Sequence, residues 1–558
     1  MAKLILEPPG PGCWDLDDSH FDRPLNRYGQ RTYCDGVRLG STATFIRSGI
    51  PIRCISVEFV QGFPYYQVQP LIGSPAQRKL PSRSLFNVLL RIHPTLRKRR
   101  RSAERYFLHR LWEEDVSEWD TVTKPTLFKR FHALEKIELG SLSDEQLIDH
   151  LQDCTGALRD NMYAHFYITA ATYIPVGDFL AHVTEWTSIP VHEVLQAMLG
   201  TSGTDNASER LLRNAAQTIA DDSKVRELLF SDGSPEDIVQ RLCATPGPVG
   251  EACSSWYQWI APRCISTGDL TVPTGQESPE LLVEHLRYAV DHPMPQMDPK
   301  VALEKLRDQI PANRRTQFDH LFETAHSVYR LRDERSTLLD NWISGILRLA
   351  LLEVGSRMTT QQRLEKTEHV FDIDEDEMRS LFLGGVGPTP EELRDRSEQR
   401  LSQSMDDVPK YLGGLPAPVP PAEYFPREMG RMVRAILAYT ELLENLTEPA
   451  STTVLMGIGA SAGESQGPVR IVQAAEDFAK VRPGDILVAR TTMPAYNVLL
   501  PIIAGIVTDR GGALCHAAIV AREYGIPAVV GTRSATKDLE EGTTIRINGS
   551  EGTVTTVP

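Results

Sequence analysis

The chain has 558 residues, of which 41% are hydrophobic and 24% are charged. This balance is ordinary for a globular protein and excludes wholesale disorder, collagen and a long coiled coil, and the length predicts two to four domains of about 100–200 residues. There are 59 Lys and Arg residues against 74 Asp and Glu residues, a net charge of −15, which disfavours a nucleic-acid or membrane partner.

Targeting and metal signals are weak. No apolar run approaches the roughly 18 residues of a membrane-spanning helix. The start of the chain has only Leu4–Leu6 as an apolar run, too short for a signal peptide, so we expect a cytoplasmic protein. The eight cysteines are scattered without a C-x-x-C pair, which predicts reduced thiols and no metal site.

The first part of the chain, residues 1–90, is rich in Gly, Pro, Tyr and β-branched residues. Ile52–Val60 and Tyr65–Val68 are predicted strands. We therefore expect a small β-containing N-terminal part.

The middle of the chain, residues 91–446, is predicted to be mainly helical. Apolar residues recur there at three- and four-residue spacing, in Leu147–Met162, Ser208–Leu229, Pro279–Val290, Pro299–Leu331 and Leu338–Glu353. A Pro-rich stretch, Gly413–Pro421, precedes a last helix over Pro426–Leu446.

The C-terminal part, residues 457–558, changes to a composition dense in Gly, Val, Ile and Thr. One short helix is predicted over Ala517–Glu523, and five short strands are predicted over Ile486–Ala489, Gly505–Thr508, Ala528–Val530, Thr544–Ile547 and Thr553–Val557. This pattern predicts a separate α/β domain of normal size. Residues 447–456 are predicted to be a hinge linker, because small polar residues there tolerate backbone rotation. The fold class is thus multidomain α+β.

One segment of the C-terminal part carries a chemical signature. An apolar strand runs into Gly511-Gly512, where the chain can turn with positive φ. Cys515 and His516 then precede an Ala-rich helical turn, and a helix N-terminus stabilises a phosphate. An imidazole at that position can accept a phosphoryl group.

Four residues are expected to bind the phosphate. The two glycines allow the turn, a small side chain leaves room for the phosphate, and an arginine one and a half turns along the helix can return toward the anion. They are Gly511, Gly512, Ala517 and Arg522.

The string from Gly511 to Gly531 closely resembles the phosphohistidine swivelling domain of the phosphoenolpyruvate-utilising enzymes. The match includes His516-Ala-Ala, Ala521-Arg-Glu and Gly525-Ile-Pro-Ala-Val-Val-Gly. Upstream, Gly459–Gly463, Gly484–Val488 and Thr492–Pro494 also match. The resemblance implies that His516 becomes phosphorylated. It also implies that Cys515 is either an acid or base beside it or a packing substitute for Ser or Thr.

The family's usual nucleotide domain is not recognisable. The first 300 residues do not resemble an ATP-grasp domain, and the given sequence contains no G-x-x-x-x-G-K-[ST] phosphate loop. We also expect no phosphoenolpyruvate-binding barrel of the kind that follows the histidine domain in the synthases. Phenylphosphate synthase has its histidine and ATP subunits on separate chains. The resemblance therefore implies that this chain binds no cofactor and that ATP and Mg²⁺ sit on a partner ATP-grasp subunit.

The helical region is similar, more weakly, to the substrate-binding domain of rifampicin phosphotransferase. The similar segments contain Arg23, Arg263 and Tyr329–Arg335. Ala261-Pro262 replaces the family's Gly-His before Arg263. The family's substrate contacts are therefore not carried over as a set. The resemblance implies substrate contacts at Arg23 and Arg263 through these local segments alone.

Three further sets of residues each have two interpretations. Arg332, Glu334 and Arg335 are predicted either to clamp the phosphoryl group or to form an ion-pair ladder along their helix. His165, in an aromatic-rich helix, is either a general base for the acceptor or a core histidine. The basic run Arg97–Arg101 is either a solvated helix face or a docking surface for the partner.

The functional hypothesis is a substrate-binding and phosphocarrier component of a split ATP-dependent, dikinase-type phosphotransferase. His516 would pass its phosphoryl group to a phenolic or enolic hydroxyl of a small organic substrate. Two alternatives stay open: activation of a carboxylate for condensation, and a regulator that uses the histidine domain only for binding.

Overall fold

The computed structural model describes residues 4–557, apart from 19–20, 22, 77–81, 199–206, 266–268, 292–298, 442–453, 474, 493–495, 497–498 and 501. The chain divides into two compact units. Unit 1 comprises Met1–Asp178, Gly268–Thr271 and Leu331–Ile436; unit 2 comprises Phe179–Thr267, Val272–Arg330 and Leu437–Pro558. The helical region 91–446 therefore contributes to both units, which differs from the division into domains expected from composition.

Unit 1 contains a four-stranded antiparallel sheet in the order β2-β3-β1-β4. The strands are β2 (Ile52–Val60), β3 (Phe63–Pro70), β1 (Trp14–Leu16) and β4 (Tyr411–Leu412). The predicted N-terminal sheet is thus present, and its edge strand comes from far along the chain. A buried cluster that includes Trp14, Phe63, Tyr65 and Leu412 fills one side of it.

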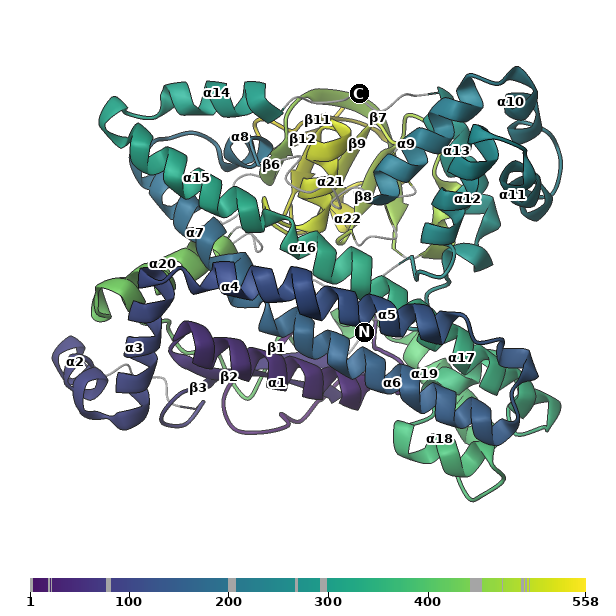
Figure 1. Ribbon diagram of the computed structural model, residues 1–558, viewed down its shortest axis with the longest axis horizontal. Coiled ribbons are helices and arrows are strands. Elements are labelled where there is room, and N and C mark those ends of the chain that lie inside the picture. Colours follow the sequence, from purple (N-terminus) through teal and green to yellow (C-terminus); the bar gives the residue numbers. More distant parts are fainter. Residues whose placement is uncertain are drawn as a thin grey trace. The chain divides into compact units, whose positions relative to one another are not determined.

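Long helices pack beside this sheet. Helix α1 (Gln30–Ser48) lies against α6 (Asp144–Tyr167), as Figure 1 shows. A Cβ on Gly36 would lie 2.3 Å from the Cβ of Met162, and one on Gly40 would lie 2.5 Å from the Tyr163 carbonyl oxygen. Glycine is therefore required for this close approach of the two helices.

The remaining helices of unit 1 are mostly long and regular. They are α2 (Arg83–Ile92), α3 (Pro94–Leu108), α4 (Leu111–Glu118), α5 (Lys124–Glu135), α7 (Thr169–Trp186, shared with unit 2), α16 (Leu331–Asp333), α17 (Asn341–Thr360), α18 (Glu375–Phe382), α19 (Pro390–Ser402) and α20 (Arg427–Glu441, also shared with unit 2). Two π-helical turns, Trp119–Thr123 and η5 (Glu334–Asp340), interrupt the α-helical winding.

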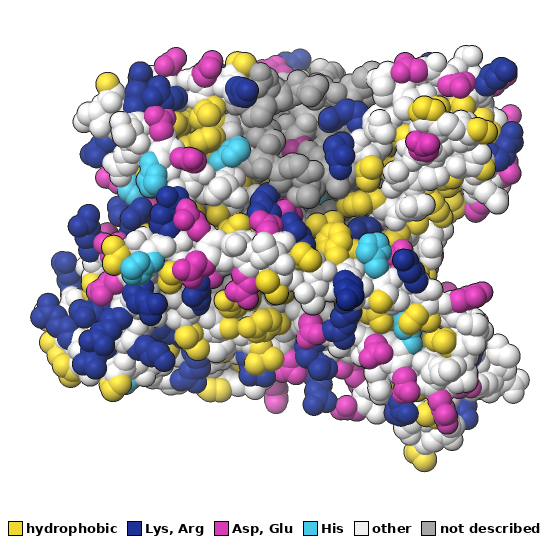
Figure 2. Space-filling model, in the orientation of Figure 1, with side chains coloured by type: hydrophobic (Ala, Val, Ile, Leu, Met, Phe, Trp, Pro, Cys, Tyr) yellow, Lys and Arg dark blue, Asp and Glu magenta, His cyan; other side chains and the backbone are white. Residues whose placement is uncertain are grey.

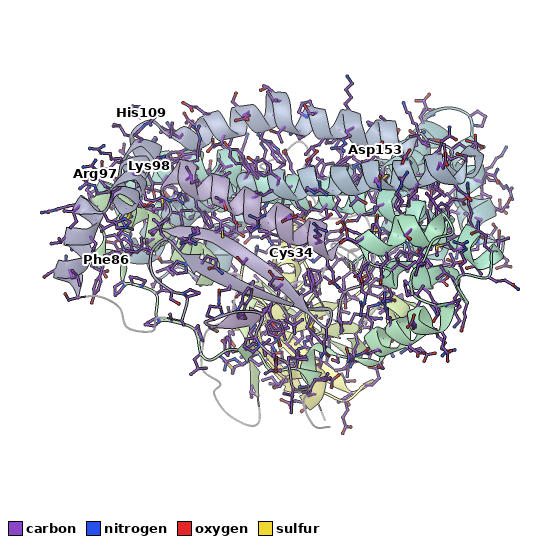
Figure 3. The ribbon with its side chains drawn as sticks, turned by 90° about the horizontal axis from the view of Figure 1, so that it is seen from below. Cys34, Phe86, Arg97, Lys98, His109 and Asp153 are labelled. Carbon is purple, nitrogen blue, oxygen red and sulfur yellow. The ribbon has the colours of Figure 1, made fainter. Side chains whose placement is uncertain are left out.

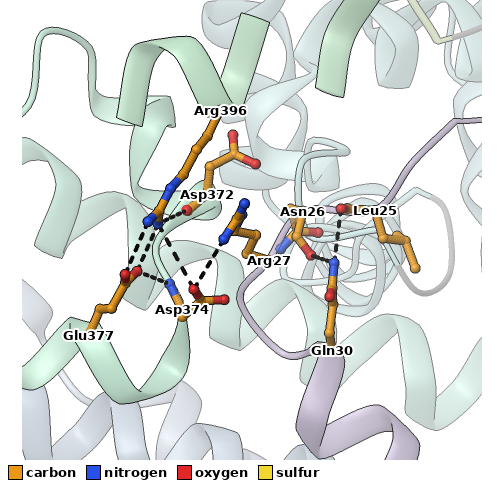
Figure 4. Close-up of polar contacts among 8 residues, drawn as sticks. All are labelled: Leu25, Asn26, Arg27, Gln30, Asp372, Asp374, Glu377 and Arg396. Atoms are coloured by element: carbon orange, nitrogen blue, oxygen red, sulfur yellow. Dashed lines mark hydrogen bonds and ion pairs between the residues drawn. The ribbon is translucent and has the colours of Figure 1, made fainter. Parts of the chain in front are cut away.

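A polar network ties the start of α1 to the segment before α19 (Figure 4). Arg27 pairs with Asp374 at 3.3 Å, and Arg396 pairs with Glu377 at 2.8 Å and donates to the Asp372 carbonyl. The bidentate Arg396–Glu377 contact lowers the pKa of Glu377, chiefly through its hydrogen bonds. The network joins segments more than 300 residues apart within unit 1.

Unit 2 combines helices with the C-terminal sheet. Its helices are α8 (Val191–Gln196), α9 (Ala207–Ala220), α10 (Ser223–Leu229), α11 (Pro235–Ala244), α12 (Pro248–Ile260), α13 (Pro279–Asp291), α14 (Pro299–Gln309) and α15 (Arg315–Tyr329). Helices α9–α13 share an apolar core that includes Ile219, Leu229, Trp256 and Leu286.

The C-terminal sheet has eight strands in the order β5-β12-β11-β7-β8-β9-β10-β6. The strands are β5 (Leu455–Met456), β6 (Ile458–Ser461), β7 (Glu464–Val472), β8 (Ile486–Ala489), β9 (Gly505–Thr508), β10 (Ala528–Val530), β11 (Thr544–Asn548) and β12 (Thr553–Thr556). Neighbouring pairs from β7 to β10 are parallel and the others antiparallel. The predicted α/β fold is therefore present.

Two residues of the expected hinge linker, Leu455 and Met456, belong to this sheet. Residues 447–453 lie outside the described part of the chain. Leu455–Met456, which were assigned to the linker, form β5 and pair with β12. The C-terminal domain therefore begins at or before Leu455 rather than at residue 457.

Candidate functional site

His516 opens helix α21 (His516–Tyr524), which follows β9 and precedes β10. Helix α21 lies against β6 and β10 (Figure 1). In such a strand–helix–strand unit the carboxyl ends of the parallel strands and the helix N-terminus meet at one edge of the sheet, where ligands bind. His516 is placed at that edge and is partly exposed.

The turn before α21 depends on Gly511. Its φ is 101°, and a Cβ there would lie 2.7 Å from Sγ of Cys515. The N–H of Cys515 donates to the Gly512 carbonyl oxygen at 3.0 Å, so the chain folds back tightly before the helix. Cys515 is the N-cap residue, and its side chain makes no capping hydrogen bond. The predicted glycine turn therefore sets Cys515 and His516 side by side.

The His516 imidazole is held by a residue from another loop. Oγ1 of Thr492, three residues beyond β8, lies 3.0 Å from Nδ1 of His516. Sequence reasoning matched Thr492 to a family loop but gave it no role. This contact at Nδ1 orients the imidazole and distinguishes its two ring nitrogens.

The buried face of helix α21 is formed mainly by small side chains. Ala517 and Ala518 are buried in the core of the domain, next to Ala521 and Val520. Ala517 therefore contributes to packing, and its small size allows the first turn to sit close to the sheet.

Arg522 does not lie where the sequence placed it. It is 3% exposed in the last turn of α21, and its Nη1 donates to the Ala460 carbonyl oxygen at 2.8 Å. The side chain thereby fastens α21 to β6. Its expected role in binding the phosphate at the other end of the helix has no support in this placement.

His165 and Arg335 come together in unit 1. Nδ1 of His165 lies 2.9 Å from Oδ2 of Asp340, and Nη1 of Arg335 donates to the His165 carbonyl oxygen at 3.2 Å. Sequence reasoning found both residues but missed Asp340. The separation of 175 positions between His165 and Asp340 gives no local signal.

Glu334 has a different environment. It is 2% exposed, and its Oε2 accepts from Nε1 of Trp119 at 2.8 Å and from Nζ of Lys124 at 2.9 Å. These contacts join Glu334 to the helical segment that carries Trp119 and Lys124. They fit neither a role in binding phosphate nor an ion-pair ladder within its own helix. Arg332 lies in α16 and is partly exposed.

Arg23 and Arg263, the arginines of the two family-like segments, belong to different units. Arg23 is partly exposed in the segment before α1 of unit 1. Arg263 belongs to unit 2, is 6% exposed, stacks over the Trp259 ring at 4.3 Å and donates to the Trp259 carbonyl oxygen. A buried, locally bonded Arg263 indicates a packing role.

The basic run lies on α3. Arg97 and Lys98 are exposed at one end of unit 1 (Figure 3). Lys and Arg side chains gather over α2 and α3 in Figure 2. Arg99 is buried, which lowers its pKa to about 10. The run is therefore exposed at Arg97, Lys98 and Arg101, half-buried at Arg100 and buried at Arg99, and both interpretations of it stay open.

The described residues contain neither a membrane-spanning helix nor a metal-binding group. No helix among them is long and apolar enough to cross a membrane. No group of three or more His, Cys, Asp or Glu side chains within this described part is arranged to hold a metal ion.

Comparison with known proteins shows what the segment around His516 is similar to. Residues 481–552 match the model of the PEP-utilising enzyme, mobile domain. The chain is 32% identical over 247 residues to an uncharacterised phosphotransferase, YvkC, of Bacillus subtilis, a match that covers 44% of this chain and 27% of that protein.

Shorter matches are confined to about a fifth of the chain. The chain is 44% identical over 115 residues to a probable phosphoenolpyruvate synthase of Archaeoglobus fulgidus, covering 20% of this chain and 15% of that protein. It is 43% identical over 109 residues to rifampicin phosphotransferase of Bacillus cereus, covering 20% and 12%. The matched parts thus span about a quarter or less of these relatives. Residues 481–552, which contain His516, are therefore similar to the mobile domain of PEP-utilising enzymes.

Proposed function

We propose that this chain is the phosphocarrier and acceptor-binding component of an ATP-dependent phosphotransferase. His516 receives a phosphoryl group on Nε2 and passes it to a small organic acceptor. The observation that carries the proposal is the placement of His516 at the N-terminus of α21 with Thr492 on Nδ1, inside a matched mobile domain.

The chemistry follows from this geometry. The helix N-terminus offers N–H donors and partial positive charge to the phosphoryl oxygens. A proton on Nδ1, directed at the Thr492 hydroxyl, lets the ring leave as neutral imidazole when the phosphorus–nitrogen bond breaks. Transfer then depends mainly on positioning and charge neutralisation.

The phosphoryl donor is proposed to be ATP with Mg²⁺ on a separate ATP-grasp subunit. The basic face of α3 is a candidate surface for that partner. Carrying the group between a donor and an acceptor site requires the mobile domain to move.

The test uses the full chain, the candidate ATP-grasp partner and ATP labelled on the β-phosphate. We expect label on the protein that is stable in base and labile in acid, and no label on His516→Ala. Label that persists in His516→Ala would contradict the assignment. To test the chain without its partner, phosphoramidate replaces ATP as the phosphoryl donor, and the same dependence on His516 is expected.

A further inference from the structure

A stripe of polar and aromatic side chains follows one face of two helices in unit 1. Asn161, His165, Thr169 and Tyr173 are spaced four residues apart along α6 and the start of α7. The winding continues between the helices, because the Ile168 N–H donates to the Ala164 carbonyl oxygen at 3.1 Å. Residues four apart share a helix face, and polar groups buried there require partners.

The π-helical turn η5 supplies those partners. Oδ1 of Asp340 accepts from Nδ2 of Asn161 at 2.6 Å, and Oδ2 contacts Nδ1 of His165. Nη1 of Arg335 donates to Oγ1 of Thr169 at 2.7 Å. Five positions separate Arg335 from Asp340. In an α-helix they would face directions about 140° apart, and i→i+5 winding reduces this angle, so that both can reach the same helix face.

The His165–Asp340 pair has the form of a general base and its orienting carboxylate. In the tautomer with its proton on Nδ1, His165 donates to the Asp340 carboxylate, and Nε2 is then the basic nitrogen. The side chains are 18% and 9% exposed, so the pair is largely withdrawn from water, while the imidazole keeps some access to the surface of unit 1.

Positive charge lies next to this pair. Arg335 is 6% exposed, and its guanidinium stacks over the Tyr173 ring at 5.4 Å. Its Nε is buried and has no hydrogen-bond partner among the described residues. A cation in this position favours an anionic or developing anionic group beside His165.

We propose that His165 is the general base of the acceptor site, that Asp340 positions it, and that the acceptor is a hydroxyl compound rather than a carboxylate. This inference rests on the proposed function of His516. A carboxylate is already ionised at neutral pH and has no proton to give up. A hydroxyl keeps its proton until the oxygen attacks phosphorus, so it benefits from a base.

The step balances as follows. The acceptor hydroxyl gives its proton to Nε2 of His165, and its oxygen forms the new bond to phosphorus. The bond between phosphorus and Nε2 of His516 breaks, and its electron pair stays on the imidazole. The products are a phosphate monoester and neutral His516, and His165 then releases its proton to water.

The experiment uses the full chain loaded on His516 with phosphoramidate. Discharge is measured at pH 8 with phenol, which is protonated because its pKa is about 10, and with 4-nitrophenol, which is largely ionised. His165→Ala is expected to slow discharge to phenol by about 100-fold and to leave discharge to 4-nitrophenolate within about threefold. Asp340→Asn is expected to show the same selectivity with a smaller loss. A change in fold would slow both acceptors alike.

The controls separate the two proposals. His132→Ala alters an exposed histidine that lies 3.8 Å from Glu135 in the same unit and is expected to change neither rate. Loading that does not depend on His516 would defeat the proposed function. Two results with normal loading of His516 would overturn only this inference. In the first, His165→Ala is discharged by phenol as fast as the wild type; in the second, His165→Ala slows discharge to both acceptors equally. Benzoate is tested as a carboxylate acceptor, and hydroxylamine traps the acyl phosphate that it would form as the hydroxamate. If benzoate discharges the wild type and neither phenol does, the assignment of a hydroxyl acceptor is wrong.

Discussion

The Thr492 hydroxyl oxygen lies 3.0 Å from Nδ1 of His516 and thereby joins the loop after β8 to the helix after β9. This contact orients the imidazole about its side-chain bonds and distinguishes its two nitrogens. A carrier histidine must present the same nitrogen to two different sites, so a fixed ring orientation serves both halves of the reaction.

The first prediction concerns this hydroxyl. Thr492→Val keeps the shape of the side chain but removes the hydrogen bond, which is worth about 1 kcal/mol. We expect loading of His516 by phosphoramidate to slow by roughly five- to tenfold, with some phosphate appearing on Nδ1. Phosphorus NMR distinguishes the two isomers. Thr492→Ser should behave like the wild type, and unchanged loading confined to Nε2 in Thr492→Val would show that the contact does not orient the ring.

The second prediction concerns the turn before His516. Gly511→Ala places a Cβ against Cys515 at a φ of 101°, so the loop must shift and displace His516. We expect loading to fall at least tenfold. Gly542→Ala is the matched control, because Gly542 has a φ of 80° but no atom within 4 Å of its added Cβ. That control should cost about 1 kcal/mol of unfolding free energy and leave loading unchanged. Equal losses of loading in both variants would count against the steric argument.

The C-terminal domain was predictable because its signals are local. The predicted strands Ile486–Ala489, Gly505–Thr508 and Ala528–Val530 have the bounds of β8, β9 and β10, and the predicted helix Ala517–Glu523 lies within α21. Short apolar strands between glycines, and a helix begun by a glycine turn, are determined by neighbouring residues.

The rest depends on contacts between distant residues. Nothing near Tyr411 indicates that it joins Asp15 in a sheet, and nothing near His165 indicates Asp340. The π-helical winding of η5 is likewise set by tertiary packing, since its residues fit an ordinary helical pattern. Arg522 was misplaced because sequence spacing gives the turn of the helix on which a residue lies but not the group to which a long side chain reaches.

The third prediction follows from the observed place of Arg522. Arg522→Leu removes a buried guanidinium and leaves the Ala460 carbonyl oxygen without this donor. We expect the free energy of unfolding to fall by about 2–3 kcal/mol, measured by urea denaturation, while the folded fraction loads phosphate at the wild-type rate. Arg546→Leu, at an exposed position on β11, should change neither quantity. Loss of loading at unchanged stability would restore Arg522 to the phosphate site.

The last prediction concerns pH and His285, in α13 of unit 2. Burial lowers its pKa to about 4, and neither ring nitrogen has a hydrogen-bond partner in the described part of the chain. In the unfolded chain a histidine binds a proton near pH 6.5. Between about pH 6.5 and 4 the unfolded state therefore holds more protons than the folded state, so folding stability falls as the pH falls through this range.

His285→Leu removes this contribution and fills the same apolar site. We expect the fall in unfolding free energy between pH 6.5 and 4.5 to become shallower by on the order of 2 kcal/mol, measured by denaturation at a series of pH values. Burial also lowers the pKa of His150, His192, His326 and His369, so part of the slope should persist. His320→Leu is the matched control, because His320 is exposed on α15. Its unfolding free energy should change with pH as that of the wild type does. An unaltered slope in His285→Leu would mean that His285 takes up a proton in the folded protein as readily as in the unfolded chain.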